Sequence, residues 1–590
     1  MRVDSLQKTV SLYLTGRATL PDDMFSFENK HSNLTKQELD DMEISSMEEY
    51  KKSEEESFQF KNPALNLKAD FNTVHGQFRM AGIGVINSLF SGIGTGFGSK
   101  LNFLSGFGLA CTSLLVSVFK KLPILSTKFS IMGYGGNLIR GPLHILDSIF
   151  STIGEQGSKY TLPSIVSGAL SLFGLQRTLN DKDNKSLELP FDTISGTLGR
   201  TAIHHVDSML ASKAAQISAK NHSLGSFLAS SVTTLGLLLP DELKKKKIPW
   251  NTHEGFIAQG GSHFVDSLFS SAGNSLSSFF GNTKNALLAA SGVALGMPLV
   301  GSLLNSINYQ IPFATLEGRL VRGIMHAPET VVFNLGSVLG NSALGMPLSF
   351  ALLGSTYFAC MSKNGKELIK NFEISRDKIG GQVQRLPFHL LYSMISASGV
   401  KLSKLIPAPL LAIFGPALSF QLGERFKNIE SKYDDFKGLM LRNSVHLWET
   451  ILARAAYKTG RMITGTQDEH QSSGSILSDG RWLSDDGRIV PTMAIGKQTS
   501  EFSTKSFSDI LCSALGGIGF AMGAFVLGKH FFGKENQPLD KEVSQAMAII
   551  PEEINKSVKR FDFAPIYKLP PLPEEELLPA AYKRRRVVNA

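Results

Sequence analysis

The chain has 590 residues, far more than one ordinary hydrophobic core organises, so several domains or a repeat array are expected. Hydrophobic residues make up 42% of it and the mean hydropathy is +0.02, which provides enough apolar surface for a continuous core. The net charge of +9 is modest for this length and permits contact with acidic lipid or nucleic acid without requiring either. The three cysteines lie far apart in apolar surroundings, which excludes a disulfide framework and a CxxC metal pair.

The first 70 residues form a polar, acidic leader. Residues 36–57 contain few apolar side chains and no sustained periodicity, so a disordered arm is expected over 1–70. The opening stretch lacks the apolar segment of a secretory signal, and no cleavable signal peptide is therefore expected.

One short pattern recurs about every 60 residues after this arm. Its clearest copy contains Gly136, Arg140, His144 and Asp147. Histidines in the same register return at 204, 263, 326, 389 and 446, in steps of 60, 59, 63, 63 and 57 residues. A fixed period of this length is typical of repeat proteins. Units are expected to start near residues 76, 136, 196, 255, 318, 381 and 438, within a repeat region at 71–458.

Each unit has the pattern of a helical hairpin. Its first half places apolar residues at helical spacing, and its second half is more uniformly apolar, as in residues 162–175. Prolines near the histidines, Pro142, Pro328 and Pro387, indicate that the main helix begins or is kinked there. The predicted fold is all-α, with seven or eight hairpins in a solenoid or ring.

The charged and histidine positions of the pattern are four and three residues apart, so on one helix they share a face. We call this set the polar stripe. Its members are Arg140, His144, Asp147, Arg200, His204, Asp207, His263, Asp266, Arg322, His326, Glu329, Arg385, His389, Arg442, His446 and Glu449.

The leading interpretation of the polar stripe is structural. Arginines would pair with acidic residues of the same or an adjacent unit and fix the register of the repeats, since a buried charge without its partner is costly. Gln259 and Tyr392 depart from the pattern, because each removes one charge from its copy. The alternatives are an anion-binding groove or pore lined by Arg and His, and a metal site, for which no second ligand spacing exists. No nucleotide-binding or hydrolase motif stands out, so no catalytic residues, no cofactor and no enzyme activity are expected.

The apolar second halves of the units are candidates for membrane-spanning helices. Most run for fewer residues than the roughly 20 that a membrane span needs, and Gly, Ser or Pro interrupts them. The strongest candidates are 102–119 and 509–528, with lysines just outside both. The sequence leaves open whether these helices enter a bilayer or form a soluble core.

The end of the chain differs from the repeats. Residues 459–500 are polar and contain Asp-Gly turns, which predicts an inserted loop, and 501–534 form an apolar terminal repeat or membrane helix. Residues 535–590 form a charged, proline-containing tail with two short signals: Glu574, Glu575 and Glu576, then Lys583, Arg584, Arg585 and Arg586.

The glutamate cluster near the C-terminus resembles the export signal of effectors secreted by Legionella-type Dot/Icm type IV systems. This resemblance covers only the last 20 or so residues and implies delivery into a host cell. The basic tetrapeptide is an alternative targeting patch for nuclear import or acidic lipid.

The sequence therefore predicts a non-catalytic helical repeat protein that associates with or inserts into membranes, with lipid as its main partner. A secreted effector is one form of this hypothesis. The alternatives are a soluble α-solenoid scaffold that binds protein or an anionic ligand, and a structural component of a phage or secretion machine. Protein partners and self-association are compatible with either, whereas nucleic acid is not an expected partner.

Overall fold

The computed structural model describes residues 69–118, 123–129, 134–180, 188–361 and 371–466, apart from isolated residues or pairs within them, and three strands between 474 and 490. The chain divides into residues 1–523 and 524–590, and everything described here belongs to the first unit. The described part is almost entirely helical, as the sequence predicts.

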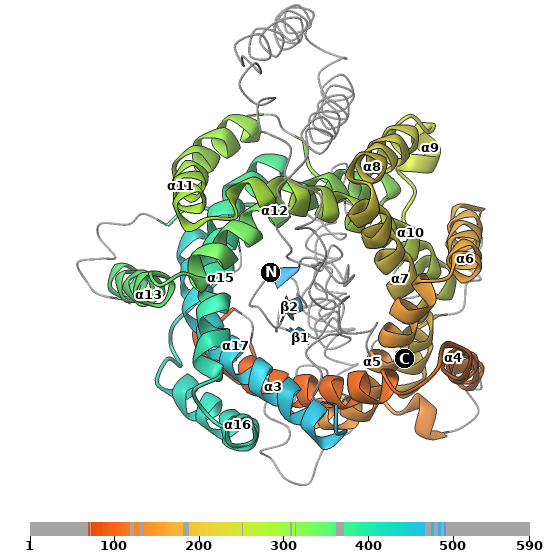
Figure 1. Ribbon diagram of the computed structural model, residues 1–590, viewed down its shortest axis with the longest axis horizontal. Helices are drawn as coiled ribbons and strands as arrows, with labels where there is room; N and C mark the ends of the chain where they lie inside the picture. The colour runs from red at the N-terminus through yellow and green to blue at the C-terminus, as the bar shows by residue number, and fades with distance from the viewer. Residues whose placement is uncertain are drawn as a thin grey trace, which may run out of the picture. The chain divides into compact units, whose positions relative to one another are not determined.

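Long helices alternate with shorter ones along the chain (Figure 1). The long helices are α3 (Val74–Gly98), α5 (Tyr134–Ser158), α7 (Ile194–Lys220), α10 (His253–Ser277), α12 (Leu316–Asn341), α15 (Ile379–Ser403) and α17 (Phe436–Ile463). The shorter ones, here called the outer helices, are α4 (Phe103–Val118), α6 (Thr161–Asn180), α8 (His222–Leu237), α11 (Thr283–Asn305), α13 (Gly345–Met361) and α16 (Ala408–Glu424).

The remaining elements are short. They are the helix α9 (Asp241–Lys244), the 3-10 turns η4 (Pro123–Ser126) and η5 (Ser278–Phe280), and the strands β1 (Gly474–Ile476), β2 (Trp482–Ser484) and β3 (Ile489–Val490). The strands form an antiparallel sheet in the order β1-β2-β3. This sheet falls within the polar range 459–500, and β1 lies against α3 and α17.

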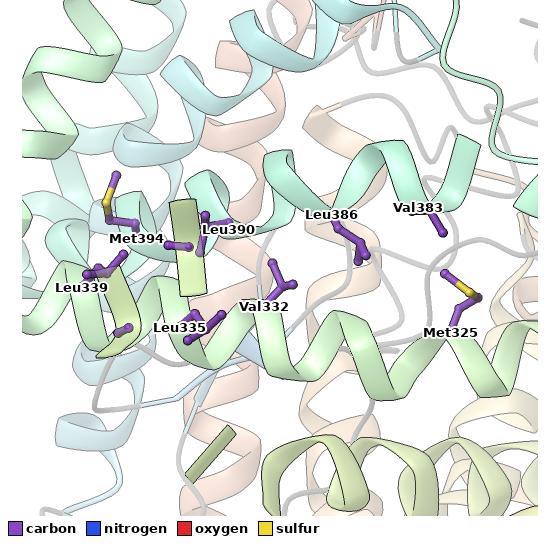
Figure 2. Close-up of a cluster of buried hydrophobic side chains, with 10 residues drawn as sticks. Met325, Val332, Leu335, Leu339, Val383, Leu386, Leu390 and Met394 are labelled. Atoms are coloured by element: carbon purple, nitrogen blue, oxygen red, sulfur yellow. The ribbon is translucent and has the colours of Figure 1, made fainter. Parts of the chain in front are cut away.

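Each long helix packs against the next long helix, and α17 packs against α3. The contact between α12 and α15 illustrates the apolar part of this packing (Figure 2). Met325, Val332 and Leu339 recur every seven residues along α12, and they meet Leu386 and Leu390 of α15. This spacing keeps one stripe of a helix facing its neighbour along their length.

Glycines allow the long helices to approach closely. A Cβ atom at Gly92 of α3 would lie 2.2 Å from the carbonyl oxygen of Tyr457 in α17, and one at Gly460 of α17 would lie 2.2 Å from that of Leu89. A Cβ at Gly336 of α12 would similarly lie 2.4 Å from the carbonyl oxygen of Leu390. The abundant glycines within the apolar stretches therefore serve backbone-to-backbone contact.

The residues just before each long helix, here called the entry segments, link neighbouring units by short antiparallel bridges. The bridged pairs are Lys128 with Thr193, Glu188 with Thr252, Lys247 with Thr315, Gln310 with Lys378, Glu373 with Asp435, and Glu430 with Thr73. The last pair joins the entry segment of α17 to that of α3. The order of contacts around the long helices is therefore cyclic.

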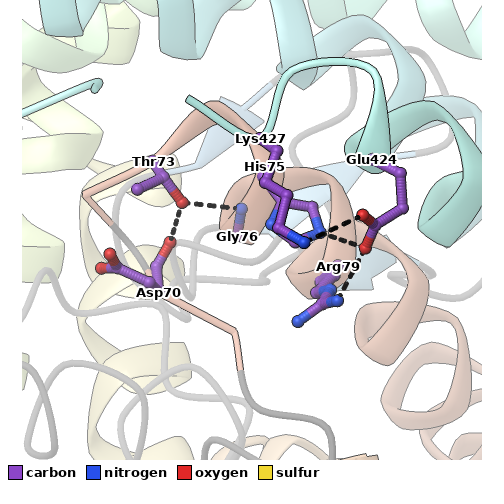
Figure 3. Close-up of polar contacts among 7 residues, drawn as sticks. All are labelled: Asp70, Thr73, His75, Gly76, Arg79, Glu424 and Lys427. Carbon is purple, nitrogen blue, oxygen red and sulfur yellow. Dashed lines mark hydrogen bonds and ion pairs between the residues drawn. The ribbon is translucent and has the colours of Figure 1, made fainter. Parts of the chain in front are cut away.

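A polar contact accompanies this closure (Figure 3). Glu424, at the end of α16, accepts a hydrogen bond from Arg79 of α3 at 2.8 Å and lies 2.9 Å from the ring nitrogen Nε2 of His75. Lys427 lies 3.8 Å from the same carboxylate. His75 thus joins the first long helix to the last of the described outer helices.

The prolines near the histidines do not mark the starts of helices. Pro142, Pro328 and Pro387 lie inside α5, α12 and α15, well after the first residue of each helix. Of the two possibilities that the sequence left open, a helix start at these prolines is therefore wrong. Thr or Asp caps set most of the starts, as described below.

Candidate functional site

The polar stripe lies on six of the long helices and is withdrawn from solvent. Every member is buried except Arg442, which is half-buried. Arg140, Arg200 and Arg322 are each only 1% exposed, although arginine is among the residues most rarely buried. Ionised groups at this depth require partners within the protein.

The carboxylates of the stripe lie beside histidines of their own helix and of the next long helix. Contacts within a helix are His204 with Asp207 at 3.4 Å, His326 with Glu329 at 3.3 Å, and His446 with Glu449 at 3.0 Å. Contacts between helices are His263 with Asp207, His326 with Asp266 at 3.8 Å, and His389 with Glu329 at 3.8 Å. The structure therefore brings stripe residues of adjacent units together in pairs, rather than around one common centre.

The arginines mainly bind the backbone of their own entry segments. Arg200 donates to the carbonyl oxygen of Leu189, Arg385 to that of Ile374 at 2.6 Å, and Arg442 to that of Ser431 at 3.2 Å. In each case the acceptor is 11 residues earlier in the chain. The guanidinium of Arg140 lies over the ring of Phe129, also 11 residues earlier. These four arginines thus hold the entry segment against its helix.

Arg322 has a different partner. Its two terminal nitrogens lie 2.9 and 3.0 Å from the two carboxylate oxygens of Glu329, so the two side chains form an ion pair along α12. The contact at 3.0 Å is a charge-assisted hydrogen bond, and the contact at 2.9 Å is an ion pair. Arg385 also meets an acidic residue, Asp434, but this residue belongs to an entry segment and not to the stripe.

The electrostatic state of the stripe follows from burial. Burial, with a smaller effect of Arg140, holds the pKa of His144 well below its ordinary value, so its imidazole is neutral. Burial alone would raise the pKa of Asp207, but His263 and His204 beside it lower that pKa overall. Tyr392, which replaces an acidic residue in its copy, stacks its ring on His446 of the next long helix.

The glycine at the start of the repeated pattern is explained by the local backbone geometry at the start of the helix. Thr73, Thr193, Thr252, Thr315 and Asp435 cap long helices, and each accepts a hydrogen bond from the backbone N–H of the glycine three residues later. A Cβ at Gly196 would lie 1.9 Å from the carbonyl oxygen of Pro190 in the entry segment, which leaves no room for a side chain. These caps are not among the features predicted from the sequence, although Thr or Asp three residues before five of the seven glycines is a readable N-cap signal.

A cleft of about 500 Å³ lies where the entry segments of α3, α15 and α17 meet. Its lining is mostly acidic or polar and includes Asp70, Glu373, Glu430 and Asp435. Within the ranges that the structure describes, no group of three or more His, Cys, Asp and Glu side chains is arranged to hold a metal ion.

The outer helices form the second candidate site, an exposed surface that we call the apolar belt. On α11, Leu288 is 78% exposed and Leu295 is 75% exposed, and on α6 Leu162 is 71% exposed. Other large exposed apolar residues on these helices are Leu104, Leu115, Ile165, Leu172, Phe173, Phe227, Leu235, Leu299, Leu303, Phe350, Leu410, Ile413 and Phe414. An exposed apolar surface that recurs on every outer helix is typical of an interaction surface.

Length and hydropathy set two described helices apart. Thr283–Asn305 (α11) and Val74–Gly98 (α3) are long and apolar enough to cross a membrane. Of their most apolar 18 residues, 11% are buried in α11 and 72% in α3. The helices α12 and α13, taken together as one bent span, would be a third candidate. The tail residues 574–576 and 583–586, the N-terminal arm and the apolar segment 501–534 lie outside the described residues. Comparison with protein-family models, curated proteins and solved structures finds no match to this chain.

Proposed function

We propose that this protein is a closed ring of helical-hairpin repeats that associates with membranes through the apolar belt. The single observation that carries the function is the exposure of large apolar side chains on all six described outer helices. Each long helix with the outer helix that follows it makes one repeat, and α17 begins the last described one.

The bridges support the ring together with the packing of α3 against α5, which closes the circle. Each cap residue pairs with the entry segment of the preceding unit, and Thr73 of the first unit pairs with Glu430 of the last. Because α17 also packs along α3, the array presents no unpaired flank at either end. An open solenoid would instead need capping units there.

The composition and length of the outer helices favour lipid as the partner. They contain 16 to 23 residues, or roughly 24–35 Å at 1.5 Å per residue, close to the ~30 Å hydrocarbon thickness of a bilayer. Charged residues among them are confined to their ends, namely Arg177, Lys284 and Glu424. Removing one exposed leucine from water contributes about 1.5–3 kcal/mol, so a belt of such residues gives a strong drive towards lipid.

The buried stripe supports a structural role for the repeated Arg, His and acidic residues. Its carboxylates meet histidines of the next long helix, as Asp207 meets His263 and Glu329 meets His389, so these residues join neighbouring units. We therefore assign the register of the ring to the polar stripe and the contact with lipid to the outer helices.

Flotation with phospholipid vesicles tests this proposal. The full chain should rise with the vesicles and should stay in the pellet when membranes are washed with carbonate. The triple variant Leu288→Glu, Leu295→Glu, Leu299→Glu should lose most of this binding, because each glutamate must leave the hydrocarbon. The control Ile124→Glu alters a residue that is 67% exposed but lies on η4, outside the outer helices, and should float as the parent does.

Two results would contradict the proposal. One is a chain that stays monodisperse without detergent and never floats. The other is equal flotation of the triple variant and its control. A chain that instead forms discrete soluble oligomers through α11 would favour the scaffold alternative, in which protein covers the belt.

A further inference from the structure

The two ends of the ring differ in charge. Consecutive long helices run side by side in the same direction. The bridges join their N-terminal ends, and hydrogen bonds join their C-terminal ends. Gln156 of α5 donates to the carbonyl oxygen of Gly98 at 3.2 Å, Lys213 of α7 to that of Ser158 at 3.1 Å, and Lys401 of α15 to that of Gly340 at 3.1 Å. The turns from long to outer helices therefore gather at one end, here called the turn end.

The turn end is strongly basic. Counting the last two turns of each long helix, the connections that follow and the first turn of each outer helix, the basic residues are Lys100, Lys159, Lys213, Lys220, Lys284, Lys401, Lys404, Lys458 and Arg461. The acidic residue among the described positions of this set is Glu155 alone. Lys159, Lys220 and Lys404 are exposed, so their ammonium groups face solvent.

The entry segments, at the opposite end, carry acidic residues in most units. These are Asp70, Glu188, Asp192, Glu373, Asp377, Glu430, Asp434 and Asp435, and several of them line the cleft. The connections that lead into these segments also contain Asp241 and Glu242, and the basic residues of this end are Lys128, Lys244, Lys245, Lys246, Lys247, Arg376, Lys378, Arg425, Lys427 and Lys432. Some of these lysines lie beside carboxylates, as Lys427 lies beside Glu424 and Lys432 beside Glu430. The entry end is thus nearly balanced in charge, whereas the turn end has a net positive charge.

Helix dipoles do not cancel the basic charge of the turn end. The C-termini of the long helices bring partial negative charge to it, but the N-termini of the outer helices bring partial positive charge to the same place. These contributions largely offset each other, which leaves the lysines to set the potential.

Exposed apolar residues lie directly beside these lysines. Lys159 precedes Tyr160, which is 58% exposed, and Lys404 precedes Leu405, which is 73% exposed. Ile463 at the end of α17 is also exposed. Lysines next to exposed aromatic and aliphatic side chains are typical of the boundary between lipid headgroups and hydrocarbon, because each residue type finds its preferred medium there.

We propose that the turn end is the membrane-docking face of the ring and that it recognises the anionic headgroups of a phospholipid bilayer. This inference rests on the proposed membrane association and adds the lipid class and the orientation. The lysines contact the headgroups, and the adjoining ends of the outer helices enter the apolar layer first. The entry segments and the acidic cleft then face away from the anionic surface.

Flotation with two kinds of vesicle tests the inference, using phosphatidylcholine with and without phosphatidylserine. The full chain should bind the mixed vesicles more tightly, and added salt should remove the difference. The triple variant Lys159→Gln, Lys220→Gln, Lys404→Gln should lose roughly fivefold in partitioning to mixed vesicles per lysine, or about a hundredfold in total, since a lysine near an anionic surface contributes about 1 kcal/mol.

The control changes the net charge equally at the opposite end. It is Lys245→Gln, Lys427→Gln, Lys432→Gln, whose side chains are 61%, 67% and 66% exposed. It should bind mixed vesicles as the parent does. An equal loss in both triple variants would overturn the docking face, because net charge alone would then explain binding.

The remaining outcomes separate the two proposals. Equal binding to both kinds of vesicle would overturn the docking face while leaving membrane association intact, whereas binding to neither would overturn both. If the turn-end variant lost affinity for duplex DNA and kept its affinity for vesicles, the basic surface would belong to a nucleic-acid partner and the docking face would be wrong.

Discussion

The close approach of α3 to α17 predicts opposite effects for two alanine substitutions in the same helix. At Gly92 a new Cβ would lie 2.2 Å from the carbonyl oxygen of Tyr457 and 3.2 Å from its Cα, both fixed backbone atoms of α17. At Gly84 a new Cβ meets no atom within 4 Å. Both sites gain the higher helix propensity of alanine, about 1 kcal/mol, so their difference isolates the packing.

The magnitude follows from the distances. Nonbonded carbon atoms settle at about 3.5–4 Å, so Gly92→Ala must push α3 away from α17 by about 1 Å or distort one of the two helices. Overpacking of a tight interior costs about 1–3 kcal/mol, and a rigid backbone neighbour places this site at the upper end. We expect a net loss of about 2 kcal/mol for Gly92→Ala and a gain of up to about 1 kcal/mol for Gly84→Ala.

Urea unfolding in a mild detergent, followed by circular dichroism, measures both variants against the parent. The midpoint should fall for Gly92→Ala and rise for Gly84→Ala, with unchanged slopes. If both midpoints moved in the same direction, the helices would not be in backbone contact at Gly92, and the proposed closure of the ring through α3 and α17 would be wrong.

Three further predictions concern single contacts. Thr193→Ala should lower the free energy of unfolding by about 1 kcal/mol through loss of the α7 cap, and Thr193→Ser should restore it in the same unfolding assay. Glu329→Gln should destabilise the protein by about 3–5 kcal/mol because it leaves Arg322 buried without its carboxylate. The double variant that also carries Arg322→Met should recover most of this loss. Equal losses of stability in the single and double variants would disprove the pairing. Burial, with a smaller effect of His204, lowers the pKa of His205 to about 4 in the folded protein. In the unfolded chain His205 has its ordinary pKa of about 6.5, so below this pH the unfolded state binds a proton that the folded state does not. Stability should therefore fall as the pH drops from 6.5 to 4, by up to about 3 kcal/mol, and His205→Phe should flatten that part of the profile.

The sequence predicts the helical class because apolar residues recur at helical spacing and the histidines recur at a nearly constant interval. It could not identify the partners of the arginines. The contact of Arg200 with Leu189 depends on how the entry segment folds back along α7, which periodicity does not encode. It left open whether the main helix begins or is kinked at Pro142, and the structure places this proline inside α5.

The apolar belt shows a different limit of sequence reasoning. Hydropathy marks α3 and α11 alike as candidate spans, yet α3 is mostly buried and α11 mostly exposed. A glycine-rich helix in a crowded interface and a leucine-rich helix on the outside have similar average hydropathy. Only the arrangement of neighbours separates the surface that meets a partner from the surface that meets the rest of the chain.

The bridge between Thr73 and Glu430 has a consequence for local opening. In an open stack the outermost helices have one bare flank, so they fray first and their amide hydrogens exchange fastest. Here the first and last long helices shield each other, and no long helix can leave before two lateral interfaces have separated. In the proposed ring, we therefore expect all the long helices to open together, so that one weakened interface lowers the protection of distant helices as well as of its own.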